Sequence, residues 1–336
     1  MKRFISLLLA GGLCLSLAAC GKQTGLAAKR NVLESSAGIP VEDTLLTVDG
    51  RAVAAGQYLY WLAAVCDEIA AYYEAAEKPL DWGEALESGT LGEYAKNQAL
   101  RSAALYAVVE AWAEQYGCAV TEEDRAAMAA DWDAKAAEHG GEEAYLALLA
   151  RKGLDRAGAE HLAEDHYLYV QLCTLAETSD DLIPQEDLKA FFREQGYLTV
   201  DLLLLNGEGA AEKAAELFSR LNESPDPAAE FAALRTDSAY PRTLLPTDGT
   251  LPEGFDGAAA DLAEGQLSGI LESGEGYGIL LRLPDDVDAV RQDLLDHRLQ
   301  TAADEAAIQA ADAYQALDTA DFWSGLEQAR AELSAA

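Results

Sequence analysis

The sequence predicts an α+β protein that is mostly α-helical, with a small α/β domain inserted into a helical body. Two apolar runs of strand length, residues 197–205 and 276–284, enclose the predicted insert, and turn-forming residues border both runs. On both sides of this stretch, apolar residues recur at the helical spacing of three and four. The chain of 336 residues, half of them apolar, is long enough for about two domains with a substantial core.

The charge balance of the chain excludes some classes of partner. There are 24 basic and 59 acidic side chains, which gives a formal net charge of −35. Nucleic-acid binding needs clustered Lys and Arg, so no nucleic-acid partner is expected. Electrostatic docking to anionic lipid is disfavoured for the same reason. We interpret the acidic surface as a solubilising one, and a patch for basic clients remains the alternative.

The N-terminus resembles a bacterial lipoprotein signal. Lys2 and Arg3 precede an apolar stretch, residues 4–17, which is too short to span a membrane comfortably and has the length of a signal-peptide core. Leu17-Ala18-Ala19-Cys20 follows at once and resembles a lipobox. We therefore predict a signal peptide at 1–19, a lipid on Cys20 and a tether at 20–44. The chain would then be extracytoplasmic and lipid-anchored to the bacterial cell membrane. An ordinary signal peptide is the alternative.

Three further cysteines remain in the predicted mature chain, widely spaced and each among apolar residues of a predicted helix: Cys66, Cys118 and Cys173. Their spacing matches no metal site. We interpret them as small buried hydrophobic residues, and a disulfide between two of them stays open in an exported protein.

A helical domain is expected over residues 45–195. It begins with a short strand that ends in the Asp49-Gly50 turn, followed by a helix whose apolar stripe runs from Tyr58 to Tyr72. A capping box at Thr121–Asp124 starts another helix. The remaining helices are expected at 91–116, 142–152 and 154–177, and from Ile183 to Phe192.

The insert, residues 196–285, is expected to have the order βαααββ. Its helices are predicted at 209–222, 228–234 and 255–262, with a loop at 235–254 and a closing hairpin of 267–272 with 277–283. After it, residues 286–336 are expected to form a long helix reaching Leu317 and a last helix at 319–333.

The order of these segments resembles the SurA and PrsA-type extracytoplasmic foldases. The features that carry the resemblance are the Val48-Asp49-Gly50 start with its following helix, the break at 117–123, and the segment 183–192 that precedes the insert. Within the insert, Leu262-Ala-Glu-Gly-Gln-Leu-Ser268 and Gly276-Tyr277 resemble the parvulin-type (PpiC) peptidyl-prolyl isomerase domain. The resemblance implies a SurA-N-like helical domain, a parvulin-like insert and a C-terminal return helix that packs on the helical domain. It also implies unfolded or folding exported proteins as partners.

The parvulin resemblance assigns roles to positions in the insert. It places an apolar proline pocket at four residues: Leu245, Leu251, Phe255 and Ile279. Parvulins also set two histidines and an acid or thiol around the twisting bond. Here Leu202 and Gly278 occupy the histidine positions, and Thr236-Asp237 is followed by Ser238. Asp237 and Ser238 are therefore the remaining catalytic candidates. Ordinary core packing is the alternative role for Leu251 and Phe255.

We thus expect a membrane-anchored folding factor that binds unfolded exported proteins with weak or absent isomerase activity. An active parvulin-type isomerase, a solute-binding lipoprotein and a purely structural surface protein are the alternatives. The solute-binding alternative would need alternating strands and helices, and the first half is nearly all helical. No cofactor is expected. No metal site is expected either, because none of the four histidines is expected to pair with Cys or an acid in metal-ligand spacing. A homodimer stays open.

Overall fold

The computed structural model describes residues 31–235, 237 and 239–335, so the predicted signal peptide, Cys20 and Ser238 lie outside the described residues. The chain forms two compact units. The first unit consists of two segments, the chain up to Leu175 and the chain from Asp296 onward. The second unit is Ala176–Leu295. The division falls at the end of α7 (Arg156–Ala176) and inside α12 (Arg291–Glu305). The predicted fold class, mostly helical α+β with small antiparallel sheets, is confirmed.

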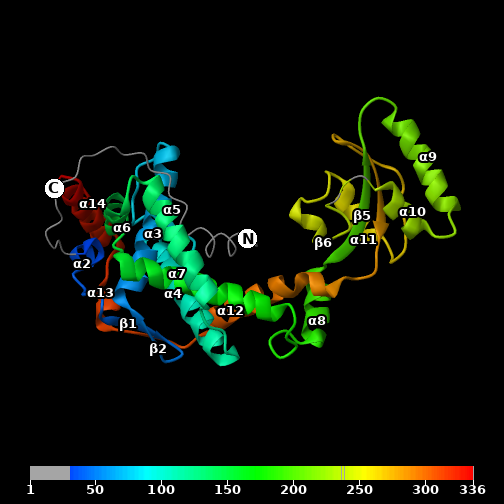
Figure 1. Cartoon of the computed structure of the whole chain (residues 1–336). Coiled ribbons are helices and arrows are strands. Elements are labelled where there is room, and N and C mark those ends of the chain that lie inside the picture. Colours follow the sequence, from blue (N-terminus) through cyan, green and yellow to red (C-terminus); the bar gives the residue numbers. More distant parts are fainter. Residues whose placement is uncertain (1–30, 236, 238, 336) are drawn as a thin grey trace. The chain divides into compact units, whose positions relative to one another are not determined.

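The core of the first unit, here called the helical unit, forms around α3 (Ala55–Ala75) and α4 (Leu91–Tyr116) (Figure 1). The middle of α4, residues 102–109, is buried at every position, because neighbouring elements cover it on all sides. On α3 the predicted stripe is buried only in its first half. Tyr58 is fully buried, whereas Tyr72 is 65% exposed.

Three further helices of this unit follow the sequence prediction: α5 (Glu122–Glu138), α6 (Glu142–Arg151) and α7. The capping box at the start of α5 is present. The Thr121 amide donates to Asp124 Oδ2 at 2.8 Å, and the Asp124 amide donates to Thr121 Oγ1 at 3.1 Å. These bonds satisfy amides that have no partner inside the helix.

The helical unit also holds a three-stranded antiparallel sheet in the order β2-β1-β9. Its strands are β2 (Arg51–Ala54), β1 (Thr44–Val48) and β9 (Ile308–Ala310), and a separate two-residue pair joins β3 (Ala85–Leu86) to β4 (Gly89–Thr90). The predicted long helix to Leu317 is therefore wrong. Helix α12 ends at Glu305, and the chain then pairs with β1. The turn at Asp49 fixes this pairing, since its carboxylate accepts from the Ala307 amide at 2.8 Å.

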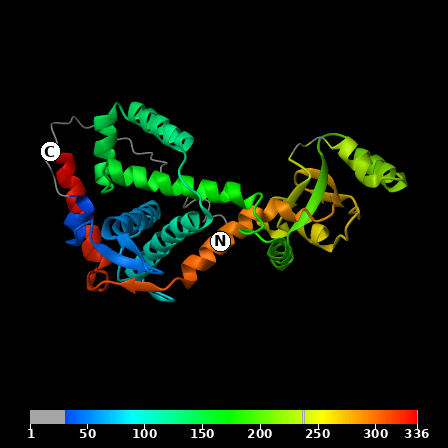
Figure 2. The same cartoon turned by 60° about the horizontal axis from the view of Figure 1, so that its bottom comes forward.

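The C-terminal helices lie against the helical unit. They are α13 (Asp312–Ala316) and α14 (Thr319–Ala335), and both views show α14 beside α2 (Val32–Ala37) (Figures 1 and 2). Lys96 Nζ donates to the carbonyl oxygens of Tyr314 and Leu317 at 3.1 and 2.7 Å. Arg330 forms a two-pronged ion pair with Asp67 at 2.6 and 2.9 Å. Three free cysteines are described: Cys66, Cys118 and Cys173.

The second unit begins with α8 (Gln185–Gln195) and is built on a four-stranded antiparallel sheet. The strand order is β6-β5-β8-β7, with β6 (Arg242–Leu244), β5 (Leu198–Leu205), β8 (Gly276–Arg282) and β7 (Leu271–Ser273). Helices α9 (Ala210–Glu223) and α10 (Pro227–Leu234) share a core with one face of the sheet, whereas α11 (Phe255–Asp261) packs on the other. Two short 3-10 helices, η2 (Pro246–Asp248) and η3 (Val287–Val290), complete it.

The element order of this unit differs from the predicted βαααββ. It is βααβαββ, because residues 242–244 of the predicted loop pair with the start of β5 as an edge strand. The closing hairpin is also shorter than predicted. Strand β7 starts only at Leu271, and Leu267 makes an isolated bridge to Leu281. A three-residue edge strand has too few alternating positions to stand out from a loop by sequence pattern.

Candidate functional site

A cavity of about 570 Å³ lies within the helical unit, and α3, α4, α5, α6 and α7 all contribute to its wall. Its wall is rich in aromatic side chains: Tyr60, Trp61, Tyr106, Trp132, Tyr145 and Tyr167. The volume lies within the roughly 300–1,000 Å³ that is typical of small-molecule and cofactor pockets. We refer to it below as the aromatic cavity.

Packing between rings holds the aromatic walls in place. The Trp61 and Tyr106 ring centroids lie 4.8 Å apart, which joins α3 to α4. The Trp132 and Tyr145 rings meet edge to face at 5.0 Å, which joins α5 to α6. The Arg156 guanidinium from α7 lies over the Trp132 ring at 4.6 Å, a cation–π contact. Trp61, Tyr106, Trp132 and Tyr145 are thus each fixed by a ring contact with another helix.

The polar groups of this wall are incompletely satisfied. Trp61 Nε1, Trp132 Nε1 and His166 Nδ1 are buried, and none has a hydrogen-bond partner in the structure. Buried polar groups are normally paired, so three unpartnered atoms among the lining residues of one cavity are an exception. Burial raises the pKa of Tyr60 to about 12, and burial also raises the pKa of Tyr106. Both phenols are therefore neutral at physiological pH.

Charged side chains surround the aromatic part of the wall. Four of them are basic, in a chain with an excess of acids: Arg125, Lys135, Lys152 and Arg156. Three are acidic: Asp131, Glu160 and Glu164. Burial lowers the pKa of Lys152. The cavity therefore combines apolar walls with charges of both signs, which is a surface suited to mixed polypeptide sequence rather than to a single small ion.

Sequence reasoning missed this cavity. On each helix, the aromatic residues that line the cavity fit the pattern of an ordinary core stripe. The local sequence does not indicate that the other four helices leave space beside these residues. The one available signal was the density of Trp and Tyr on α3, which carries Tyr58, Tyr60 and Trp61 within four residues, because α5 and α6 contribute a single ring each.

The two positions of the insert at which the resemblance predicts histidines lie in a packed core. Leu202 is 4% exposed and Gly278 is buried on the neighbouring strand. The ring of Phe255, from α11, lies over Gly278, and a Cβ atom added there would overlap that ring. The same Cβ would lie 3.4 Å from Leu202 Cδ1. The space that the resemblance allots to catalytic histidines is therefore filled by an aliphatic chain and an aromatic ring.

The other predicted site residues are only partly brought together. Leu251 and Phe255 belong to the same core cluster as Leu202. Leu245 is partly buried and is not a member of that cluster. Ile279 is in the other core, with α9 and α10, so the sheet separates it from Phe255. Asp237 is exposed and caps a turn by accepting from the Ala239 amide at 2.8 Å. The roles assigned to these residues remain predictions.

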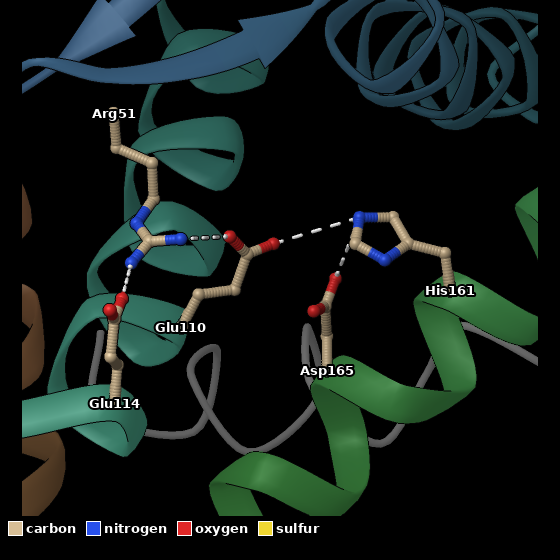
Figure 3. Close-up of polar contacts among 5 residues, drawn as sticks. All are labelled: Arg51, Glu110, Glu114, His161 and Asp165. Carbon is tan, nitrogen blue, oxygen red and sulfur yellow. Dashed lines mark hydrogen bonds and ion pairs between the residues drawn. The ribbon is translucent and has the colours of Figure 1, made fainter. Parts of the chain in front are cut away.

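A second polar cluster lies between α4 and α7 of the helical unit (Figure 3). His161 Nε2 is 3.6 Å from Glu110 Oε1 and 4.0 Å from Asp165 Oδ2. The sequence-based statement that no histidine pairs with an acid is wrong for His161. Asp165 follows it by four residues, which places both on one face of α7. The same spacing of four residues is present in the sequence.

Neighbouring groups orient and perturb this cluster. Arg51 contacts the other oxygen of Glu110 at 3.3 Å, and it also pairs with Glu114 (Figure 3). Asp165 is 1% exposed. Burial, together with the nearby Glu110 carboxylate, raises the pKa of Asp165 to about 8. The cluster therefore holds a buried carboxyl group whose ionised form is disfavoured by its surroundings.

Within residues 31–335, no described helix is long and apolar enough to cross a membrane.

No protein-family model matches the chain, and none of the curated proteins matches it. Solved structures of PrsA foldases and SurA-like chaperones are similar to it at low TM-scores. PrsA from Bacillus subtilis is 15% identical with a TM-score of 0.27, covering 74% of this chain and 92% of that one. Foldase protein PrsA from Lactococcus lactis is 12% identical with a TM-score of 0.27, covering 85% and 99%. A SurA-like chaperone of Campylobacter jejuni is 13% identical with a TM-score of 0.21, covering 80% and 99%. At these values the similarity carries no argument about activity.

Proposed function

We propose that this chain is an extracytoplasmic folding factor that binds unfolded segments of exported proteins, with weak or absent peptidyl-prolyl isomerase activity. The observation that carries the proposal is the aromatic cavity of the helical unit, with its ring-lined wall and its unpartnered buried N–H groups. Because all its lining residues belong to the helical unit, we assign client binding to that unit and not to the parvulin-like insert.

The chemistry of the cavity suits an unfolded polypeptide. Such a chain exposes apolar side chains, and their burial against aromatic walls contributes roughly 25 cal/mol per Å² of apolar surface removed from water. It also exposes backbone carbonyl oxygens, which can accept from Trp61 Nε1 and Trp132 Nε1. Because the charged side chains around the wall are of both signs, they can accommodate client segments with a positive or a negative net charge. Affinity for any one sequence would be modest, which is what a factor that must release its clients requires.

The packing of the insert favours a role in binding clients, or a role as a spacer, over catalysis of X–Pro isomerisation. Rotation about an X–Pro bond is slow because the partial double bond of the amide must be broken, and an enzyme must favour the twisted amide over both planar forms. The polar groups expected around such an amide are replaced by Leu202 and Gly278, and Phe255 fills the space between them and α11. We infer that little room is left there for a proline ring.

The proposed location of the protein rests on the sequence of its N-terminus. We propose that residues 1–19 are removed and that Cys20 carries the lipid that holds the chain at the membrane. Changing Cys20→Ala is expected to move the processed chain from the membrane fraction to the soluble fraction. Unchanged fractionation would remove the lipid anchor from the account and leave the client-binding proposal standing.

Two assays on the same preparation test the functional proposal. Micromolar protein is expected to slow the light-scattering aggregation of a chemically unfolded client. In a refolding reaction limited by proline isomerisation, the same protein is expected to leave the rate within about twofold of buffer. A large acceleration would establish the active isomerase instead. Absence of both effects would exclude the folding factor in either form.

A further inference from the structure

Three potential metal ligands converge between α4 and α7, outside the aromatic cavity. One atom each of Glu110, His161 and Asp165 lies within 4.8 Å of the other two (Figure 3). Zn²⁺ bonds to imidazole and carboxylate are about 2.0–2.2 Å long, which puts two ligand atoms about 3–4 Å apart. The 3.6 Å and 4.0 Å separations of His161 Nε2 from its two neighbours fall in that range. The spacing therefore needs only small side-chain adjustment to accept an ion.

A second, independent observation points to a ligand here. Asp165 Oδ2 is buried without a hydrogen-bond partner, in a residue that is 1% exposed, and it is the same atom that faces His161 Nε2. An unpartnered carboxylate oxygen in the interior is costly, and buried charges are normally paired or coordinate a metal. No cationic side chain contacts this oxygen in the described part of the chain except His161, which is charged only when protonated.

The remaining groups are arranged as supports. Arg51 holds Glu110 Oε2 at 3.3 Å and so leaves Oε1 directed at His161. Such contacts to the outer atoms of a ligand fix its orientation in metal sites. His161 is about half exposed, so an ion can reach the site from solvent.

We propose that Glu110, His161 and Asp165 bind a divalent first-row transition-metal ion, with Zn²⁺ as the ion that best suits one imidazole and two carboxylates. The two carboxylates balance the charge of the ion, and a water molecule would complete its coordination. The ion joins α4 to α7. Because α7 also contributes Arg156, His166 and Tyr167 to the aromatic cavity, the ion stiffens one wall of that cavity. The proposal stands on these side chains alone and does not depend on the proposed function.

The test is calorimetric titration of the full chain with ZnCl₂ after removal of bound metal by a chelator. One saturable site is expected. Asp165→Asn and His161→Gln are each expected to weaken its affinity at least tenfold. Both changes keep size and polarity, so circular dichroism is expected to show the same helix content. Two matched controls, Glu114→Gln and His166→Gln, remove a neighbouring carboxylate and a neighbouring imidazole that are not ligands. They are expected to bind Zn²⁺ within about twofold of the unchanged chain.

A second readout is the melting temperature. Zn²⁺ is expected to raise that of the unchanged chain and of both controls, because the ion binds the folded state, and to leave Asp165→Asn unshifted. The proposal is overturned if the unchanged chain shows no saturable binding. It is equally overturned if the two ligand variants bind Zn²⁺ as tightly as the controls do, since the ion would then be held elsewhere.

Discussion

The aromatic ring of Phe255 covers the α-carbon of Gly278, so that position accepts no side chain larger than hydrogen without displacing the ring. The contact joins α11 to the central strand β8 and belongs to one of the two cores of the insert. It explains why glycine stands where the parvulin resemblance expects a histidine. The two positions at which the resemblance predicts histidines, Leu202 and Gly278, are buried.

This contact predicts the outcome of restoring a side chain. Gly278→Ala is expected to lower the free energy of unfolding of the insert by about 1–3 kcal/mol, because the new methyl group forces Phe255 out of its packed position. Urea denaturation followed by a probe in the insert measures it. Gly269→Ala is the control, since a Cβ there meets nothing within 4 Å. Equal stability of Gly278→Ala and the unchanged chain would show that the space is open.

The Leu202 and Gly278 substitutions could be read from the sequence, but the filling of the space between them could not. The residue that fills it, Phe255, is more than 20 positions from Gly278, and its local pattern fits both a pocket wall and a core. Elements with strong local signals were predicted well, such as the capping box at Thr121. The strand at Ile308–Ala310 was missed because its partner, β1, lies more than 250 residues earlier in the chain.

A buried ion pair in the insert gives a prediction with a pH dependence. Arg235 Nη1 lies 2.8 Å from Asp201 Oδ2, and the Asp201 side chain is 4% exposed. Removing one partner of such a pair leaves a buried charge unpaired. Arg235→Met is therefore expected to cost about 3–5 kcal/mol at neutral pH, measured by urea denaturation.

The cost of Arg235→Met should shrink on acidification. Burial raises the pKa of Asp201, and Arg235 opposes that rise. Without Arg235 the pKa of Asp201 is higher still, so the folded state binds a proton that the unfolded state does not. Stability of the variant relative to the unchanged chain then increases as the pH falls from 7.5 to 5.5. A deficit that stays constant between these two pH values would contradict the burial of an uncompensated carboxylate.

The capping box of α5 should contribute measurably to stability. Thr121→Ala removes the oxygen that accepts from the Asp124 amide, and about 1 kcal/mol of stability is expected to be lost. Thr121→Ser keeps that oxygen and should retain most of the stability. Thermal unfolding of the two variants compares them. Equal loss in both would mean that the methyl group, rather than the hydrogen bond, is what matters.

The cysteines should differ in reactivity. Burial raises the pKa of Cys66 to about 12, and its side chain is fully buried. Since the thiolate is the nucleophile, Cys66 is expected to resist iodoacetamide at pH 8 in the folded chain and to react after unfolding. Cys118 and Cys173 are partly exposed, and both should be labelled before Cys66. Mass spectrometry of the digested protein locates the label, and early labelling of Cys66 would contradict its burial.

Unfolded segments of exported proteins are proposed to bind in the aromatic cavity of the helical unit. Two neighbouring alanines of α5 provide the most direct test, because both are exposed but only Ala129 lines the cavity, whereas Ala130 does not. Ala129→Trp places a large ring in the cavity without removing a core side chain, and Ala130→Trp adds the same ring outside it. The measurement is the affinity of each variant for a fluorescently labelled, permanently unfolded client. Ala129→Trp is expected to bind this client at least fivefold more weakly than the unchanged chain, and Ala130→Trp is expected to bind it with unchanged affinity. Equal affinities of the two variants would contradict binding in the cavity.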